Sequence, residues 1–487
     1  MKKNSIQANF IFNCILTASN FIFPLITYPY VSRILLPAGT GKVSFATSLV
    51  YYFTVFAQLG IPTYGVRLCA GLRDDRKKLS RAVQELLLIQ LITTLIAGIA
   101  FVLAIFSVPR LQQEKQLYMV VGAGIIFQLL GMEWLYRALE QYQYIAKRSL
   151  IFKAIAVVMM FLLIRAEKDY VIYGALSIFA SSASYICNFI NSRKYVDLFP
   201  PQKLELRNHL KPILVFFAMS CAVTLYSHID TIMLGFMKTD VEVGYYNTAI
   251  KVKTIMVSFI TSLSVVLLPR AAYYRQHGML KQFEIISRKS LNFSTVAASP
   301  IALYFILFAA PAVYLLSGSL YAPSILPMRI IMVSLVLIGI SYAIGMQILV
   351  PLGKERSVLY SEITGAVVNI VSNAILIPAF STTGAAISNV LAEGTVLLVQ
   401  LVAVRRAMNN VFEDVRWLKI IAALLAGICA SVWVLRLSLG NFLTMAISAM
   451  CFFAAYLLVL IVARESLTLQ MLAQIIGKVK KLLHRDI

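Results

Sequence analysis

The amino-acid sequence predicts an all-α polytopic membrane protein with about fourteen transmembrane helices. Of its 487 residues, 60% are apolar, against about 45–50% in soluble domains. Apolar runs of about 20 residues recur along the whole chain, and each is long enough to cross a hydrocarbon core of about 30 Å as a helix. The connections between the runs are short. Transmembrane β-strands are shorter and alternate in polarity, which excludes a barrel.

The apolar runs predict where each helix crosses the membrane. In chain order, the predicted spans are 9–32, 43–66, 82–108, 117–139, 149–166, 170–192, 211–237, 244–268, 290–317, 325–350, 357–378, 382–404, 417–436 and 441–463. The chain starts with MKKNSIQANFIFN, which has no small-residue cleavage site, so we expect the first run to be retained as a helix.

The distribution of Lys and Arg orients these helices. An even number of spans places both termini on one side, and about 33 of the 44 Lys and Arg fall in segments on that side. Because cytoplasmic segments retain Lys and Arg, we expect both termini in the cytoplasm. The same bias accounts for the net charge of +23, and we expect no nucleic acid as a partner.

A weak internal repeat predicts two halves. Pro62 and Pro269 each end a predicted span before a basic loop, and Gly174 and Gly384 each open a later span, at offsets of 207 and 210 residues. The predicted parts are an N-terminal six-helix bundle over 1–210, a C-terminal six-helix bundle over 211–410, two appended transmembrane helices over 411–463, and a basic amphipathic cytoplasmic tail over 464–487. Transporters that close around a central site are often built from such repeats. The tail is expected to lie on the membrane surface, with a partner-binding helix as the alternative.

Polar side chains at steps of three or four form a stripe on each of four predicted helices. The stripes are Asn9, Asn13, Thr17, Asn20, Pro24 and Thr27; Ser44, Thr47, Tyr51, Thr54 and Gln58; Ser220, Thr224, Ser227 and Thr231; and Asn247, Lys251, Thr254, Ser258 and Thr261. Such stripes either join packed helices by hydrogen bonds or line water. Their matching places in the two halves favour a shared central cavity lined by Asn20, Gln58, Asn247 and Thr254.

Lys251, Lys253, Arg33 and Lys42 are the candidate cations of this cavity. A charge at the bilayer centre costs about 2.5–3.5 kcal/mol on insertion scales, and a hydrated cavity removes most of that cost. Lys251 lies on its polar stripe and is the strongest candidate. Arg33 and Lys42 lie near span ends, where snorkelling to lipid headgroups is an equal alternative. Excess positive charge favours an anionic substrate group such as phosphate.

Two further ionisable residues precede Lys251 in the chain. Asp230 either offsets one of the cations or carries a coupling ion, and a structural salt bridge is the alternative. His228 lies on a different helix face, and a hydrogen-bonded packing role fits it better than ion coupling.

No cofactor is expected from the sequence. The six cysteines have neither metal nor redox spacing, which favours a packing role. The phosphate-binding pattern GxxxxGK[ST] does not occur, so direct use of ATP is not expected. A proton, sodium or the membrane potential is left as the coupling source.

Three long stretches resemble the Wzx-type polysaccharide flippases of the multidrug/oligosaccharidyl-lipid/polysaccharide (MOP) exporter superfamily. They are FPLITYPYVSRILLPAGTGKVSFATSLVYYFTVFAQLGIPTYGVR (23–67), HIDTIMLGFMKTDVEVGYYNTAIKV (228–252) and ILVPLGKERSVLYSEITGAVVNIVSNAILIPAFSTTGAAISNVLAE (348–393). The resemblance implies two six-helix bundles whose first, second, seventh and eighth spans line the cavity. It also implies that Arg33, Lys42, Lys251 and Lys253 bind a diphosphate. The chain reads LLPAG at 35–39, where family members often carry an acidic LGPEG, so a role for that acid does not transfer.

The expected function is therefore translocation of undecaprenyl-diphosphate-linked oligosaccharide repeat units by alternating access. The expected location is the bacterial cytoplasmic membrane, and the partners are this glycolipid, membrane lipid, and candidate polymerase and chain-length proteins. A peptidoglycan-precursor flippase and an ion-coupled drug antiporter of the same superfamily are alternatives. A membrane polymerase or ligase is the alternative from a different class, but the outer connections are too short to build its usual catalytic domain.

Overall fold

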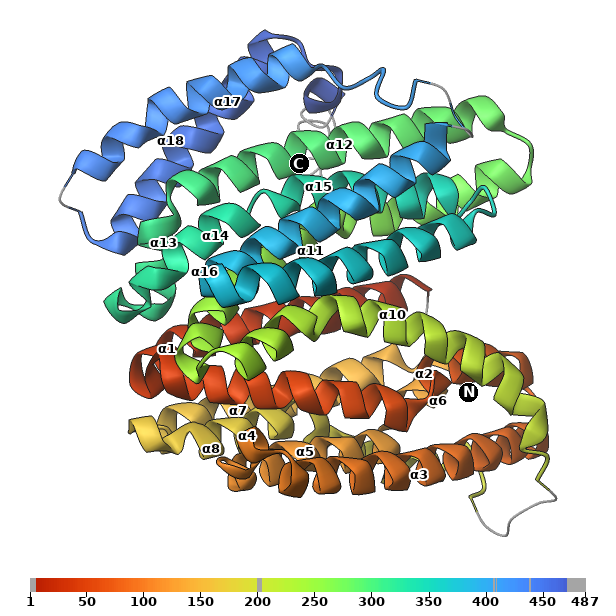
Figure 1. Ribbon diagram of the computed structural model, residues 1–487. Helices are drawn as coiled ribbons and strands as arrows, with labels where there is room; N and C mark the ends of the chain where they lie inside the picture. The colour runs from red at the N-terminus through yellow and green to blue at the C-terminus, as the bar shows by residue number, and fades with distance from the viewer. Residues whose placement is uncertain (1–5, 199–203, 406–407, 409, 438, 471–487) are drawn as a thin grey trace, which may run out of the picture. The chain divides into compact units, whose positions relative to one another are not determined.

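The computed structural model describes residues 6–198, 204–405, 408, 410–437 and 439–470 (Figure 1). These residues form helices joined by short connections, and no strand occurs among them. The predicted all-α class is confirmed for this part of the chain. Most of the predicted tail, together with the side chains of Asn9 and Asn13, lies outside the described residues.

By internal packing the chain divides into two compact units, Met1–Asn247 and Thr248–Ile487. The helices of the first unit are α1 (Ile6–Gln58), α2 (Ile61–Leu72), α3 (Arg76–Ser107), α4 (Pro109–Gln112), α5 (Lys115–Gly131), α6 (Glu133–Ala138), α7 (Tyr142–Leu163), η1 (Glu167–Asp169), α8 (Tyr170–Ile178), η2 (Phe179–Ala183), α9 (Ser184–Ser192) and α10 (Arg207–Met237). Helix α11 (Asp240–Gln276) begins in the first unit and continues into the second. The predicted six-helix halves with their boundary at 210 stay a prediction.

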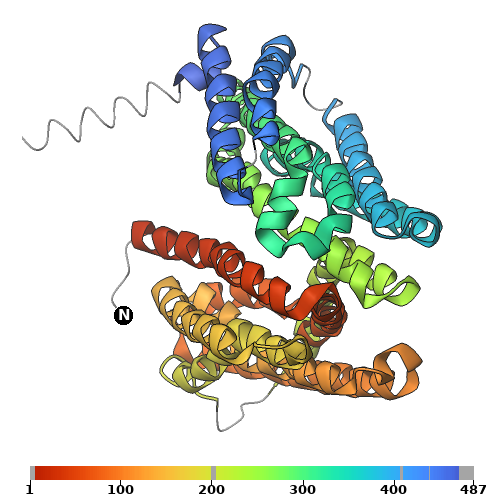
Figure 2. The same cartoon turned by 90° about the vertical axis from the view of Figure 1, so that its left-hand side faces the viewer.

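The second unit continues from α11. Its further helices are α12 (Leu280–Leu307), α13 (Ala309–Ser317), η3 (Ser319–Ser324), α14 (Ile325–Ile331), α15 (Ser334–Tyr342), η4 (Ala343–Leu349), α16 (Glu355–Arg405), α17 (Trp417–Ser431), η5 (Val432–Arg436) and α18 (Asn441–Val462). The last two long helices lie side by side in both views (Figures 1 and 2), where Ala423 of α17 packs with Tyr456 and Leu460 of α18.

The predicted count of fourteen spans is not confirmed. Among the described residues, eight helices are long and apolar enough to cross a membrane, or nine if the bent pair Ser319–Ile331 and Ser334–Leu349 is one span. Two of the long helices contain a non-helical residue, Leu36 in α1 and Ser381 in α16. Each of these breaks falls between two predicted spans, so each of these helices combines a pair of them.

Local sequence explains the break in α1. Leu36 precedes Pro37, and a residue before proline is pushed away from helical ψ. Its backbone has φ 58° and ψ 177°. Proline also removes an amide donor from the helical hydrogen-bond pattern. The two helical parts of α1 therefore meet at this residue.

Buried apolar side chains hold each unit together. In the first unit, Ile61, Leu86 and Trp134 belong to one core cluster that joins α2, α3 and α6. In the second unit, Leu291, Ile344 and Leu397 belong to a cluster that joins α12, η4 and α16. The cluster of the first unit also contains Ile213 of α10, so it holds together α2 and α10, which line the site.

Candidate functional site

Two adjoining hollows in the first unit form the candidate site. The first, called the polar pocket here, has a volume of about 320 Å³ and is lined by Tyr51, Val55, Gln58, Gly60, Pro62, Thr63, Phe216, Ser220 and Thr224. The second, called the α2–α10 groove, has a volume of about 430 Å³ and is lined by Tyr64, Arg67, Leu68, Gly71, Leu72, Pro212 and Phe216. Phe216 lines both, so the hollows adjoin each other along α10.

The polar pocket lies at the break between α1 and α2. Leu59 and Gly60 have φ values of 44° and 75°, in the left-handed region. Glycine is needed at position 60, because a Cβ there would lie 2.5 Å from the backbone nitrogen of Phe217. Pro62 then stands in the first turn of α2, where its missing amide costs no hydrogen bond. The break thus brings the chain against α10 and leaves the pocket beside it.

The lining of the polar pocket comes from two of the predicted polar stripes. Tyr51 and Gln58 belong to the stripe of the second predicted span, and Ser220 and Thr224 to that of the seventh. Gln58 Nε2 donates a hydrogen bond to Gln128 Oε1 at 2.8 Å, which orients the amide. The structure therefore brings these two stripes together in one pocket.

A buried chain of hydrogen bonds fixes one wall of the α2–α10 groove. Tyr64 Oη lies 2.8 Å from His209 Nδ1, and His209 Nε2 lies 2.7 Å from Glu85 Oε2. A carboxylate only accepts, so His209 Nε2 donates to Glu85, while Nδ1 forms the hydrogen bond with the Tyr64 hydroxyl. Glu85 also accepts from Arg81 Nε at 3.1 Å. This chain joins α2, α10 and α3 next to Arg67.

In the first unit, the predicted cations Arg33 and Lys42 have protein partners. Lys42 Nζ lies 2.5 Å from Glu114 Oε1 and 4.5 Å from the centre of the Tyr170 ring. The exposed Arg33 donates from Nη1 to the Pro29 carbonyl oxygen at 2.5 Å. Both stay predicted substrate contacts.

In the second unit, the predicted cations Lys251 and Lys253 lie on α11. Lys253 Nζ donates to Asn389 Oδ1 at 2.7 Å and lies 3.4 Å from Glu393 Oε1. Lys251 is half-buried. The Lys253–Glu393 pair escaped sequence reasoning because its members lie far apart in the chain. The roles of Lys251 and Lys253 in substrate binding stay predictions.

The acid and the histidine that precede Lys251 are both held in the first unit. Asp230 is 5% exposed, and its Oδ2 accepts a hydrogen bond from Tyr246 Oη at 2.6 Å. His228 packs against the Tyr51 ring at 4.6 Å between centres, and its Nδ1 lies 3.4 Å from Ser48 Oγ. The roles of Asp230 and His228 both stay predictions.

The other predicted lining residues are placed differently. Asn20 is exposed on α1 and accepts a hydrogen bond from Lys153 Nζ at 2.5 Å. Asn247 is half-buried, and exposed Thr254 donates to the Ile250 carbonyl oxygen of its own helix at 2.9 Å. Of the four predicted lining residues, only Gln58 lines either hollow of the site.

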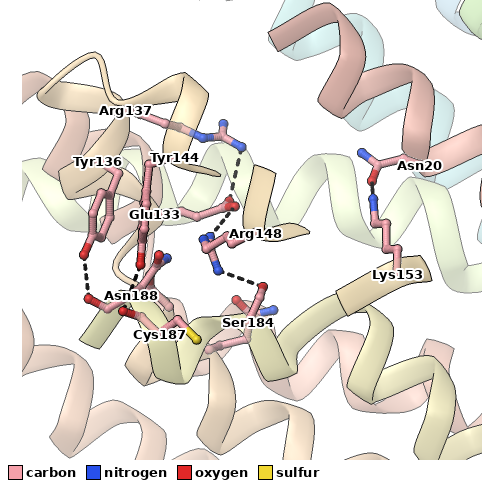
Figure 3. A network of polar contacts seen from close by, with 12 residues as sticks. Asn20, Glu133, Tyr136, Arg137, Tyr144, Arg148, Lys153, Ser184, Cys187 and Asn188 are labelled. Atoms are coloured by element: carbon pink, nitrogen blue, oxygen red, sulfur yellow. Dashed lines mark hydrogen bonds and ion pairs between the residues drawn. The ribbon is translucent and has the colours of Figure 1, made fainter. Parts of the chain in front are cut away.

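A second polar network lies inside the first unit (Figure 3). Arg148 is 6% exposed, donates to Ser184 Oγ at 2.7 Å and lies 3.3 Å from Glu133, which also pairs with Arg137. Lys153 is 8% exposed and donates to Ser19 Oγ at 2.8 Å as well as to Asn20. Sequence reasoning did not select these two buried cations, although an ionisable residue within a predicted span is itself a signal for Lys153.

Comparisons with known proteins relate the chain to a polysaccharide biosynthesis family and to O-antigen transporters. The family model described as "Polysaccharide biosynthesis protein" matches residues 6–274. The "Putative O-antigen transporter" of Escherichia coli (strain K12) is 22% identical over 408 residues, which cover 83% of this chain and 97% of that protein.

Solved structures share the fold at lower sequence identity. "Lipid II flippase MurJ, inward closed conformation" matches with a TM-score of 0.75 and 15% identity, covering 93% of this chain and 99% of that one. An inward-facing multidrug resistance MATE family transporter of the MOP superfamily matches with a TM-score of 0.63 and 14% identity, covering 83% and 99%. Both likenesses concern the fold alone.

Proposed function

Because the chain belongs to the polysaccharide biosynthesis protein family, we propose that it is a flippase for lipid-linked oligosaccharides. Its substrate is an oligosaccharide repeat unit joined by diphosphate to undecaprenol, and it acts in the bacterial cytoplasmic membrane. It is a transporter and not an enzyme. The Escherichia coli relative, whose name gives O-antigen as its cargo, aligns over almost its whole length and supports this proposal.

One structural observation carries the proposal beyond family membership. Two stripes of polar side chains meet in a pocket of a helical protein that exposes many large apolar side chains. Gln58, Thr63, Ser220 and Thr224 offer amide and hydroxyl groups, which hydrogen-bond to sugar hydroxyls. A polar pocket next to an arginine-lined apolar groove suits a substrate that is part glycan, part phosphate and part lipid.

The proposed mechanism is alternating access. The glycan and diphosphate enter a polar cavity from the cytoplasmic side while the polyprenyl chain stays in lipid. Arg33, Lys42, Lys251 and Lys253 neutralise the diphosphate through charge-assisted hydrogen bonds. Asp230 offsets this charge or carries the coupling ion, and a proton, sodium or the membrane potential supplies the energy. A polymerase and chain-length proteins then use the delivered repeat units.

The fold does not separate this proposal from its nearest alternatives. A lipid II flippase and a multidrug transporter have the same fold at similar identity. The family match over 6–274 and the nearly full-length alignment with the Escherichia coli relative favour a polysaccharide substrate. A drug antiporter for organic cations favours carboxylates in its binding site, whereas the predicted cavity of this chain is cationic.

The sidedness of the lipid-linked glycan in depleted cells tests the proposal. An impermeant label or sugar-specific lectin is applied to the outer leaflet of the cytoplasmic membrane. Depletion is expected to leave complete repeat units on the inner face and to remove the surface polymer. Unpolymerised single repeats that still reach the outer face would place the block at polymerisation and contradict a flippase.

A further inference from the structure

We propose that the α2–α10 groove is a binding site for the phosphate group and adjoining isoprenoid chain of a polyprenyl diphosphate. Arg67 contacts the phosphate, and Leu68, Leu72 and Phe216 contact the chain. This inference rests on the proposed function, because it places part of that substrate on named residues of the first unit. It adds a contact outside the four cations that the sequence selects.

Arg67 differs in its partners from the other arginines of the basic segment 67–81. Among the described residues, Arg67 has neither an acidic nor a hydrogen-bonding partner, and it is exposed in the groove. Arg73 pairs with Glu140 at 3.0 Å, and Arg76 pairs with Asp197 at 2.7 Å. A guanidinium binds phosphate through two parallel hydrogen bonds, and only an unpaired one can do so without losing an existing pair.

The rest of the groove is mainly apolar. Leu68, Leu72, Pro212 and Phe216 provide hydrocarbon surface directly beside the guanidinium. A free phosphate or a soluble sugar phosphate has no group that uses this surface. A phosphate attached to an isoprenoid chain uses both parts, which selects a lipid-linked ligand.

The polar pocket adjoins the groove and adds groups that can bind a sugar. Thr63 lines the pocket and Arg67 the groove, one helical turn apart and so about 6 Å along α2. Phe216 borders both hollows from α10. Along α2, the chain therefore presents the Thr63 hydroxyl, then the Arg67 guanidinium, then the apolar Leu68 and Leu72. A sugar, a diphosphate and a polyprenyl chain follow one another in the same order.

The groove is held in shape before any ligand binds. The hydrogen bonds from Tyr64 through His209 to Glu85 fix the wall beside Arg67. Ile213, one turn before Phe217 on α10, is fully buried in the core that contains Ile61. A preformed site does not need to order its walls on binding, which favours affinity.

Gly71 provides a direct test of occupancy. A Cβ at this position would meet no atom within 4 Å, so a side chain introduced here starts in open space at the lining of the groove. Gly98 on α3 also has no atom within 4 Å of such a Cβ and lines neither hollow. It is therefore a matched control for any substitution at Gly71.

The binding experiment uses the full-length chain with the photoreactive residue p-benzoylphenylalanine at position 71 or 98. The protein is placed in vesicles of phosphatidylethanolamine and phosphatidylglycerol that contain radiolabelled undecaprenyl diphosphate. We expect cross-linking at position 71 to exceed that at 98 at least tenfold and Arg67→Gln to reduce it about tenfold, whereas Lys77→Gln leaves it unchanged. Equal labelling at both positions, or capture of phosphatidylglycerol in place of the diphosphate, would overturn the proposal.

Transport of an undecaprenyl-diphosphate-linked oligosaccharide, measured in vesicles of the same two phospholipids, separates this inference from the proposed function. Gly71→Phe and Arg67→Gln are expected to lower the translocation rate about tenfold, and Gly98→Phe to leave it at the wild-type value. If the wild type transports the glycolipid and the two groove variants match its rate, the groove is not the binding site, but the proposed flippase function is kept. If cross-linking at position 71 is specific but the wild type moves no glycolipid, the proposed binding site is kept and the proposed flippase function is contradicted.

Discussion

Lys42 Nζ lies 2.5 Å from Glu114 Oε1, so a cation of α1 is paired with an acid that directly precedes α5. The Tyr170 hydroxyl donates to the same carboxylate at 2.7 Å. The three residues therefore join α1, α5 and α8 at one place. This relationship gives Lys42 a structural role next to the substrate contact that the sequence predicts for it.

The Lys42–Glu114 pair predicts that charge reversal at one residue is compensated at the other. Lys42→Glu or Glu114→Lys places like charges together and is expected to lower the thermal midpoint. The double variant restores opposite charges and is expected to recover most of that loss, with a coupling of about 1 kcal/mol because the pair is partly exposed. Thermal unfolding of the three purified variants measures this coupling. A double variant no more stable than the worse single variant would contradict the pairing.

The close contact between Gly41 and the start of α11 predicts that even an alanine side chain is too large at either glycine of this contact. A Cβ on Gly41 would lie 1.7 Å from the Asp240 carbonyl oxygen, and one on Gly244 would lie 2.1 Å from the Pro37 carbonyl oxygen. Because backbone atoms cannot move aside cheaply, Gly41→Ala and Gly244→Ala should each destabilise the protein by about 1–3 kcal/mol. The thermal midpoint of each variant is compared with that of Gly98→Ala, which has open space. Wild-type stability in both Gly41→Ala and Gly244→Ala would refute this contact.

Lys251 is the predicted cation whose removal should affect transport most. If it neutralises the diphosphate, Lys251→Ala lowers surface glycan without lowering the amount of folded membrane protein. Lys281→Ala, which removes an exposed lysine of α12, serves as the matched control. Surface polymer is measured with a lectin, and folded protein by gel filtration in detergent. Normal surface glycan in the Lys251 variant would remove Lys251 from the site.

Glu465, just beyond α18, predicts a pH-dependent contribution to stability. The side chain is 1% exposed, and burial alone opposes its ionisation. However, hydrogen bonds from Thr468 N at 2.7 Å, Asn292 Nδ2 at 3.0 Å and Thr468 Oγ1 at 2.8 Å outweigh burial and hold the pKa of Glu465 below its ordinary value.

A lowered pKa stabilises the folded state above the ordinary glutamate pKa of about 4.3, and this stabilisation is lost as the pH falls through the folded-state pKa. Glu465→Gln is therefore expected to lower the thermal midpoint at pH 7, and the difference from wild type should shrink towards pH 4. Thermal unfolding in detergent across this range measures the difference. A gap that is constant with pH would show that ionisation of Glu465 contributes nothing.

Periodicity predicted the helical class and part of the site. Tyr51 and Gln58 recur at helical spacing, as do Ser220 and Thr224, and the structure places both pairs in the polar pocket. The pattern works because residues three, four or seven apart share one helix face. It does not say which other face a stripe meets, and exposed Thr254 bonds to its own helix.

Tertiary pairing was beyond the reach of the sequence. Nothing local links Lys253 to Glu393 or Lys153 to Ser19, because these pairs come from helices far apart in the chain. The sequence did not single out Arg67 for a different reason. It is the first residue of the basic segment 67–81, whose charges are already explained by the cytoplasmic side of the predicted helices. Only the position of Pro212 and Phe216 opposite α2 makes it part of a groove.

Translocation by the purified protein tests the central claim most directly. The chain is reconstituted into sealed vesicles with an undecaprenyl-diphosphate-linked oligosaccharide, and an impermeant glycosidase reports the fraction that is accessible outside. A flippase is expected to make the protected pool accessible with time, at a rate proportional to the amount of protein. A protected pool that stays at the level of protein-free vesicles, with either a proton or a sodium gradient imposed, would contradict the account.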